Sequence, residues 1–257
     1  MRRIKQWALL STILISTALI SAAQAAIVIP AGGSWDQDGG TLDFGGTSLQ
    51  SAGQFKLGSG QLNGLDGVTI APGGQLDAGS GSIAVAGPWT NSGSFLAGSG
   101  SVVFADNATG STAISGNSLF HNLSITSTSG QTWRFAAGST QQVNGLLTIY
   151  GTPAQPIQLA SSVAGQLAYI NLLPGGTQNI HDLGVSDLSA TGQRLAAGQV
   201  NRGGSGNAIN WFAALAASVQ AIPSLSMTGV LALCLCMLLL AYCKRHTSAR
   251  RDIAHPF

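Results

Sequence analysis

The sequence contains no glutamate, and only 8% of its 257 residues are charged. Its three cysteines all lie near the C-terminal end, so residues 26–212 contain none. A domain formed by these residues cannot be stabilised by disulfides and needs another source of stability. The same residues carry four Lys or Arg against eight Asp, so they lack the basic footprint of a nucleic-acid-binding domain. The cysteines are Cys234, Cys236 and Cys243.

The sequence also lacks the clustered residues that enzymes acting on polysaccharides require. Such lyases and hydrolases need neighbouring carboxylates, or a basic residue with bound Ca²⁺. His121 and His181 have no Ser or Cys partner in a catalytic context. We therefore expect no catalytic residue, no cofactor and no metal, and we expect the Asp residues to be mainly solvated side chains. The eight are scattered at Asp36, Asp38, Asp43, Asp66, Asp77, Asp106, Asp182 and Asp187.

Residues 1–25 are typical of a secretion signal. Three basic residues among the first five provide the charged start, and residues 7–20 form an apolar run broken only by hydroxyl groups. Ala23-Gln24-Ala25 then supplies the small-x-small pattern that predicts cleavage by signal peptidase before Ala26. The alternative is a permanent N-terminal anchor, for which this apolar run is short.

A second hydrophobic segment, residues 225–243, contains no charged residue. As a helix it would be about 28 Å long at ~1.5 Å per residue, which matches the ~30 Å hydrocarbon core of a bilayer. It predicts a transmembrane helix, because no amphipathic stripe is present to pack it as a core helix. The basic end, residues 244–257, predicts a cytoplasmic tail and a body outside the cytoplasm. The stop-transfer charges are Lys244, Arg245, Arg250 and Arg251.

The segment Ile222-Pro223-Ser224-Leu225 stands directly before this span and is followed by Thr228-Gly229. Residues 222–257 resemble the IPTL-CTERM sorting signal, a relative of the PEP-CTERM tails that exosortase-type membrane proteases handle. Ser224 stands where that family has Thr, and Thr228 stands where it usually has Trp. The resemblance implies processing or anchoring near residues 222–225. Pro223 is compatible with this, because it keeps Ile222 extended and the site open. The alternative is an ordinary membrane anchor with Pro at the helix start.

A six-residue phrase recurs in the body: Gly, a polar residue, Phe or Leu, two further residues, and Gly. Three copies occupy residues 53–58, 74–79 and 93–98, and each continues with Ser-Gly. The closing glycines Gly58, Gly79 and Gly98 give a period near 20 residues. A copy without its first Gly stands at 135–139, two periods later. Another candidate at 40–45 comes too early and indicates an irregular first repeat or a cap.

This period, with short alternating strands and turn glycines, predicts an all-β body over residues 26–212 that is a right-handed parallel β-helix, or β-solenoid, of about nine rungs. Stretches such as 82–86 and 101–104 are expected to point apolar side chains inward. Stacked rungs would share one core, which explains how a body without cysteine is stable. Both ends of the stack would then need caps against edge pairing. The alternative fold is a β-sandwich.

Residues 87–125 resemble the repeats of bacterial surface β-helix proteins. The resemblance is carried by Trp89-Thr90-Asn91-Ser92-Gly93-Ser94-Phe95 and by Phe120-His121-Asn122-Leu123-Ser124-Ile125. Residues 206–212 are similar to the closing strand of such domains, and residues 213–221 would then form a linker to the sorting tail.

Several side chains of the body have more than one interpretation. Trp89, Phe95, Trp133 and Phe135 are expected in the core, with carbohydrate stacking as the alternative. Asp36-Gln37-Asp38-Gly39-Gly40 is expected to be a turn capped by Asp, and the alternative is the opening of a calcium loop without its distal acidic ligand. A further pair, Asp43 and Asp77, occupies the same position of the phrase and could line one face.

Together these features predict an exported protein of the Gram-negative cell envelope. It would pass through an inner-membrane intermediate with its body outside, and it would then reach the cell surface. We expect a non-enzymatic structural or adhesin-like role, with extracellular polysaccharide or a biofilm matrix as the surroundings. Its expected partners are signal peptidase, an exosortase-type protease, the membrane and polysaccharide, but no nucleic acid. The alternative is a polysaccharide lyase or hydrolase on the same scaffold, for which three or more Asp would have to converge in one groove.

Overall fold

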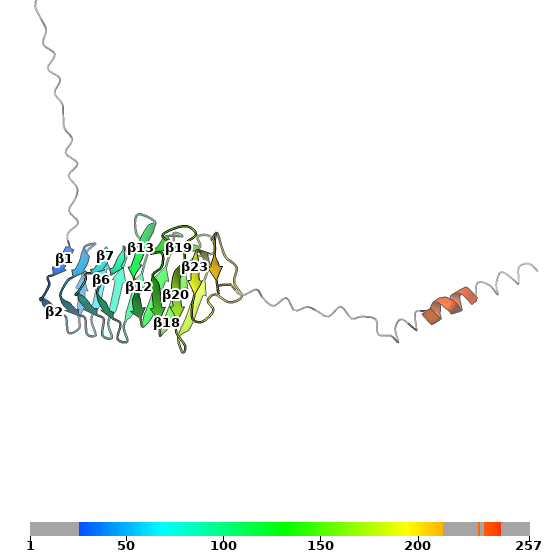
Figure 1. Cartoon of the computed structure of the whole chain (residues 1–257), viewed down its shortest axis with the longest axis horizontal. Coiled ribbons are helices and arrows are strands. Elements are labelled where there is room, and N and C mark those ends of the chain that lie inside the picture. The colour runs from blue at the N-terminus through cyan, green and yellow to red at the C-terminus, as the bar shows by residue number, and fades with distance from the viewer. Residues whose placement is uncertain (1–25, 213–230, 232–233, 243–257) are drawn as a thin grey trace, which may run out of the picture. The chain divides into compact units, whose positions relative to one another are not determined.

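The computed structural model describes residues 26–212, 231 and 234–242. The chain divides into two compact units, Met1–Ala213 and Ala214–Phe257. The first unit is a parallel β-solenoid of about nine rungs, where a rung is one circuit of the chain. Its short strands lie side by side along the stack, from β1 to β24 (Figure 1).

Three faces form the solenoid, and the chain visits them in turn. The first face is an eight-stranded sheet in the order β1-β4-β7-β10-β13-β16-β19-β22. Each strand pairs in parallel with the strand of the next rung. Its strands are β1 (Ala26–Ile29), β4 (Ser48–Ser51), β7 (Gly67–Ile70), β10 (Trp89–Asn91), β13 (Ser111–Gly116), β16 (Thr132–Phe135), β19 (Ile157–Ser161) and β22 (Leu183–Ser186).

The second face consists of two sheets, one in the early rungs and one in the later rungs. The early sheet has the order β11-β8-β5-β2, and the later sheet has the order β14-β17-β20-β23-β24. The early strands are β2 (Ser34–Asp36), β5 (Gln54–Lys56), β8 (Gln75–Asp77) and β11 (Ser94–Leu96). The later strands are β14 (Ser118–Phe120), β17 (Thr140–Val143), β20 (Ala168–Leu172), β23 (Leu188–Ala190) and β24 (Ala208–Ile209).

A seven-stranded sheet in the order β21-β18-β15-β12-β9-β6-β3 forms the third face. Every strand pair of the described solenoid is parallel, which overturns the β-sandwich alternative, because a sandwich is built from antiparallel pairs. The strands are β3 (Thr41–Asp43), β6 (Gln61–Leu65), β9 (Ser82–Val85), β12 (Ser101–Phe104), β15 (Asn122–Thr126), β18 (Leu146–Tyr150) and β21 (Thr177–His181).

The core follows the alternation of each strand. In β9 the side chains of Ile83 and Val85 are buried, and in β12 those of Val102 and Phe104 are buried, as the sequence predicts. These side chains stack in register from rung to rung. Burying one such side chain contributes about 1.5–3 kcal/mol. A continuous apolar core therefore replaces disulfides as the source of stability.

Stacked glycines explain the repeated phrase. Gly58, Gly79 and Gly98 all have positive φ angles, of 66°, 55° and 54°. A Cβ atom on Gly79 would lie 2.3 Å from the carbonyl oxygen of Gly58, and one on Gly98 would lie 2.0 Å from that of Gly79. Consecutive rungs approach each other too closely at this corner for any side chain, so the position needs glycine for two reasons.

Two assignments of the repeat are wrong. The first-rung counterpart of Phe55 is Trp35 in β2, whereas residues 41–43 form β3 on the third face. Phe135 lies in β16 on the first face and pairs with Ile114, so the copy at 135–139 belongs to a different row. The physical reason is that every corner of a three-sided coil needs turn residues around a short strand, so a six-residue phrase does not distinguish the faces.

In the second unit, residue 231 and residues 234–242 are helical. They lie within the predicted span 225–243, and the rest of that span is outside the described residues. Within the part of the chain that the structure describes, no helix is long and apolar enough to cross a membrane.

Candidate functional site

The residues predicted to be processed lie almost entirely outside the described residues. Only Ala26 falls within them, and it is the first residue of β1, where it pairs with Ser48 of β4. Cleavage before Ala26 would therefore leave the new N-terminus at the start of the solenoid. Outside the description are Ala23, Ala25, Ile222, Pro223, Ser224, Leu225, Lys244, Arg245, Arg250 and Arg251.

The aspartates do not converge in one groove. Asp36 and Asp38 belong to the first rung, whereas Asp182 and Asp187 lie beside β21, β22 and β23 in the late rungs. Within residues 26–212, 231 and 234–242, no group of three or more His, Cys, Asp or Glu side chains is placed to hold a metal ion. The arrangement that the enzyme alternative requires is therefore not seen among the described carboxylates.

Several of these carboxylates serve as turn caps at strand ends. The Oδ1 atom of Asp36 accepts a hydrogen bond from the amide of Asp38 at 3.2 Å, as expected for a capped Gly-rich turn. The suggestion that Asp43 and Asp77 line one face is wrong, because they end strands β3 and β8 on different faces. Their resemblance arises because each Oδ1 accepts from an amide two residues later, at Gly45 and Gly79, at 2.9 Å.

Two aspartates have perturbed pKa values. Hydrogen bonds from the amides of Gly165 and Asn207 lower the pKa of Asp187, and these bonds hold a loop on either side of it. Burial raises the pKa of Asp106, but the hydrogen bonds that its carboxylate accepts, including those from Thr128 and Ser129, outweigh this effect and lower it. Both groups stabilise connections between rungs, and nothing about either requires a catalytic role.

The four aromatic residues singled out in the sequence belong to the core. Trp89, Trp133 and Phe135 are fully buried, and Phe95 is 9% exposed. The ring centroid of Trp89 lies 5.0 Å from that of Phe95 and 6.0 Å from that of Phe104, both edge to face. The core prediction is confirmed, and these rings are not accessible for stacking on a sugar.

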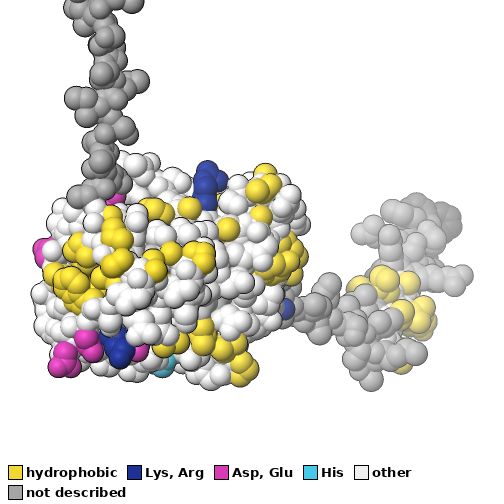
Figure 2. Space-filling model, turned by 60° about the vertical axis from the view of Figure 1, so that its left-hand side comes forward, with side chains coloured by type: hydrophobic (Ala, Val, Ile, Leu, Met, Phe, Trp, Pro, Cys, Tyr) yellow, Lys and Arg dark blue, Asp and Glu magenta, His cyan; other side chains and the backbone are white. Residues whose placement is uncertain are grey.

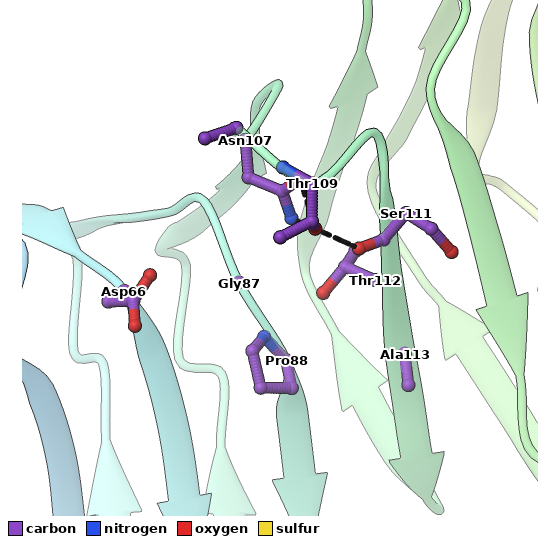
Figure 3. Close-up of a pocket in the computed structure, with 9 residues that line it drawn as sticks. Asp66, Gly87, Pro88, Asn107, Thr109, Ser111, Thr112 and Ala113 are labelled. Atoms are coloured by element: carbon purple, nitrogen blue, oxygen red, sulfur yellow. Dashed lines mark hydrogen bonds between the residues drawn. The ribbon is translucent and has the colours of Figure 1, made fainter. Parts of the chain in front are cut away.

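A hollow of about 480 Å³ opens where residues 105–110 bulge out between β12 and β13 (Figure 3). Asn107 and Thr109 lie on the bulge, and Asp66 and Pro88 come from the neighbouring first-face corner. The Thr109 hydroxyl donates to the carbonyl of Ser111 at 2.8 Å and fixes the bulge. Most of the accessible lining of this hollow is apolar, so it offers few hydrogen-bonding groups to a ligand. The sequence signals the bulge only through the longer interval between rungs.

A second surface feature lies at the end of β18. Tyr150 is 47% exposed, and its ring centroid lies 5.9 Å from that of His181 on the adjacent strand β21. A hollow of about 310 Å³ next to His181 is lined by amide side chains, among them Gln178 and Gln199. The amide groups of Gln178 and Gln199 are bonded to neighbouring backbone groups, so the exposed ring of Tyr150 is the group here that suits stacking on a sugar. Sequence reasoning missed Tyr150, because an isolated Tyr carries no pattern.

Comparison with family models, with curated proteins and with solved structures found no match for this chain. The site must therefore be interpreted from its own geometry.

Proposed function

We propose that this chain is an exported surface protein of the bacterial envelope with a structural or adhesive role. The signal segment 1–25 would be removed before Ala26. The C-terminal segment 222–257 would either be processed by an exosortase-type protease or stay in the membrane as an anchor. The solenoid would stand outside the cytoplasm, in contact with polysaccharide. We infer a right-handed coil, because parallel crossover connections almost always have that hand.

The observation that carries the proposal is that the chain combines two parts suited to two different solvents. The helical residues 234–242 are all exposed, and their large side chains are apolar on every side. Such a helix requires an apolar environment, which supports the proposed membrane span 225–243. The solenoid instead buries its apolar side chains within its own core and requires water outside.

Rows of short polar side chains on the solenoid support the adhesive role. On the first face Gln50, Thr69, Thr90 and Ser115 stand in register on successive strands. The hydroxyl of Ser115 donates to that of Thr90 at 3.2 Å. A flat row of neutral hydroxyl and amide groups can exchange hydrogen bonds with an extended polysaccharide without the cost of burying charge.

Substitution at the proposed processing motif tests this proposal. Pro223→Ala should leave the tail uncleaved, because a helix could then continue through the site and withdraw it from the protease. Immunoblots of fractionated cells should show a heavier, membrane-retained form, and Ser226→Ala, just beyond the motif, should behave like the wild type. If Pro223→Ala is processed and displayed like the wild type, the motif has no role. If all forms remain cytosolic, the export proposal is wrong.

A further inference from the structure

The first-rung end of the solenoid has no cap among the described residues. Strands β1, β2 and β3 each pair with one neighbour only, namely β4, β5 and β6. The side chain of Trp35 is 39% exposed, whereas Phe55, its partner in the next rung, is fully buried. Figure 2 brings this end toward the viewer and shows hydrophobic side chains across it, with acidic side chains at its margin. Unpaired strand edges with an exposed aromatic ring form a surface that pairs readily with another strand.

The last-rung end is closed differently. Side-chain amides of its final loops replace a further rung: that of Gln199 donates to the carbonyl of Ile180, and that of Asn201 to the carbonyl of Val185. This end nevertheless exposes Val200 at 67% and Ile209 at 49%. Within the described chain, β24 pairs only with β23, so one strand edge stays open here as well.

Charge differs between the two ends. The first rung carries Asp36, Asp38 and Asp43, all exposed. The final loops carry two of the four cations of residues 26–212, namely Arg194 and Arg202, both exposed. Arg202 forms an ion pair with Asp182 at 3.3 Å, while the side chain of Arg194 donates to the neutral amide oxygen of Asn210. Asp182 and Asp187 balance the two arginines, so the last-rung end has no net charge and does not repel the acidic first-rung end, whereas a second acidic end would.

We propose that the first-rung end docks onto the last-rung end of a second copy of this chain, so that solenoids stack head to tail. The proposal rests on the removal of residues 1–25, because the mature chain then starts at the first strand and keeps no segment to cover it. Such an interface uses two different surfaces, so a docked pair still has one first-rung end and one last-rung end free. The expected assembly is an open filament, and a closed dimer is not expected.

Cross-linking of the mature protein tests the geometry. Cys234, Cys236 and Cys243 are replaced by Ala, so that only introduced thiols react. Ser34→Cys marks the first-rung end, Val200→Cys marks the last-rung end, and a long flexible bismaleimide links thiols across a contact. The double variant should give a ladder of cross-linked trimers and larger species, and each single variant should give no cross-linked species. Dimers from Ser34→Cys alone would show a head-to-head contact, and the absence of any ladder would show that no stack forms. Either result overturns the proposal.

A second pair of variants tests the role of the aromatic ring. Trp35→Ala should lower the sedimentation-average mass at least severalfold, whereas Leu119→Ala, which removes a comparably exposed apolar side chain from the side of the stack, should leave it unchanged. Circular dichroism confirms that each variant is folded. An equal effect of both substitutions would contradict docking through the first rung. Intact mass of the same samples separates the two proposals: a retained segment 1–25 refutes the export proposal, and a correctly processed monomer refutes only the stacking.

Discussion

At the scale of a single residue, one corner of the coil requires glycine, because two consecutive rungs touch there. Gly73 and Gly79 both have positive φ angles, but a Cβ on Gly73 would meet nothing within 4 Å, whereas one on Gly79 would collide with the carbonyl of Gly58. Gly73 and Gly79 lie in the turns before and after β8, so the effect of backbone strain can be measured separately from that of steric overlap within one rung. The two positions form a matched pair for measurement.

We expect Gly73→Ala to lower the free energy of unfolding by about 1–2 kcal/mol, the cost of a left-handed conformation for a residue with a Cβ. Gly79→Ala should cost about 3 kcal/mol or more, because neighbouring rungs must also move apart. Urea titration of both variants measures the difference. Equal losses of unfolding free energy in the two variants would show that stacking does not constrain the corner at Gly79.

Asp187 supplies a pH dependence. Because the folded state lowers its pKa below the ordinary value of about 3.8, the carboxylate stabilises the fold fully above that pH. This stabilisation is lost as the pH falls through the lower, folded-state value. Asp187→Asn should be less stable than the wild type at pH 7, and the gap should close below about pH 4. Thermal unfolding from pH 2.5 to pH 7 measures both. Asn also tolerates the positive φ of 54° at this position, so a persistent gap at low pH would indicate packing and not charge.

At the scale of the elements, the sequence predicts strands better than faces. The inward alternation of Ile83 and Val85 is local, so it can be recognised without knowing what the strand packs against. The assignment of Phe135 and Trp35 to a face requires knowing how many residues each corner consumes. Paired residues are 19 apart between β4 and β7 (Ser48 and Gly67) but 26 apart between β16 and β19 (Thr132 and Gln158). Such variation lies in loops, which hydrophobic periodicity does not report.

The candidate binding features were hidden for the same reason. Tyr150 and His181 are separated in sequence by a whole rung and become neighbours only because β18 and β21 pair. The processing residues, by contrast, are predicted from local sequence alone, because targeting signals are read as short segments.

Tyr150 allows a test of the adhesive surface. Tyr150→Ala should reduce retention on an immobilised neutral polysaccharide severalfold, because it removes an exposed ring that can stack on a sugar. Leu146→Ala is the matched control, since Leu146 begins the same strand and is similarly exposed, at 41%. Affinity electrophoresis in gels containing the polysaccharide gives the comparison. If the two variants are retarded equally, the ring does not contribute to binding.

At the scale of the whole molecule, we propose that two terminal segments direct the export and the anchoring or processing of one solenoid. The body has no disulfide, since residues 26–212 contain no cysteine, and it is held by a core that extends from Ile29 to Trp211. Such a body does not depend on oxidative folding, and we expect its stability to stay the same when the terminal segments are removed.

Intact mass spectrometry of the protein recovered from the cell surface tests this account most directly. The predicted chain begins at Ala26 and ends within residues 222–225 if the tail is cleaved, or at Phe257 in a membrane-bound form if the tail is kept as an anchor. A chain that retains Met1 through Phe257 in the cytosolic fraction would contradict the account.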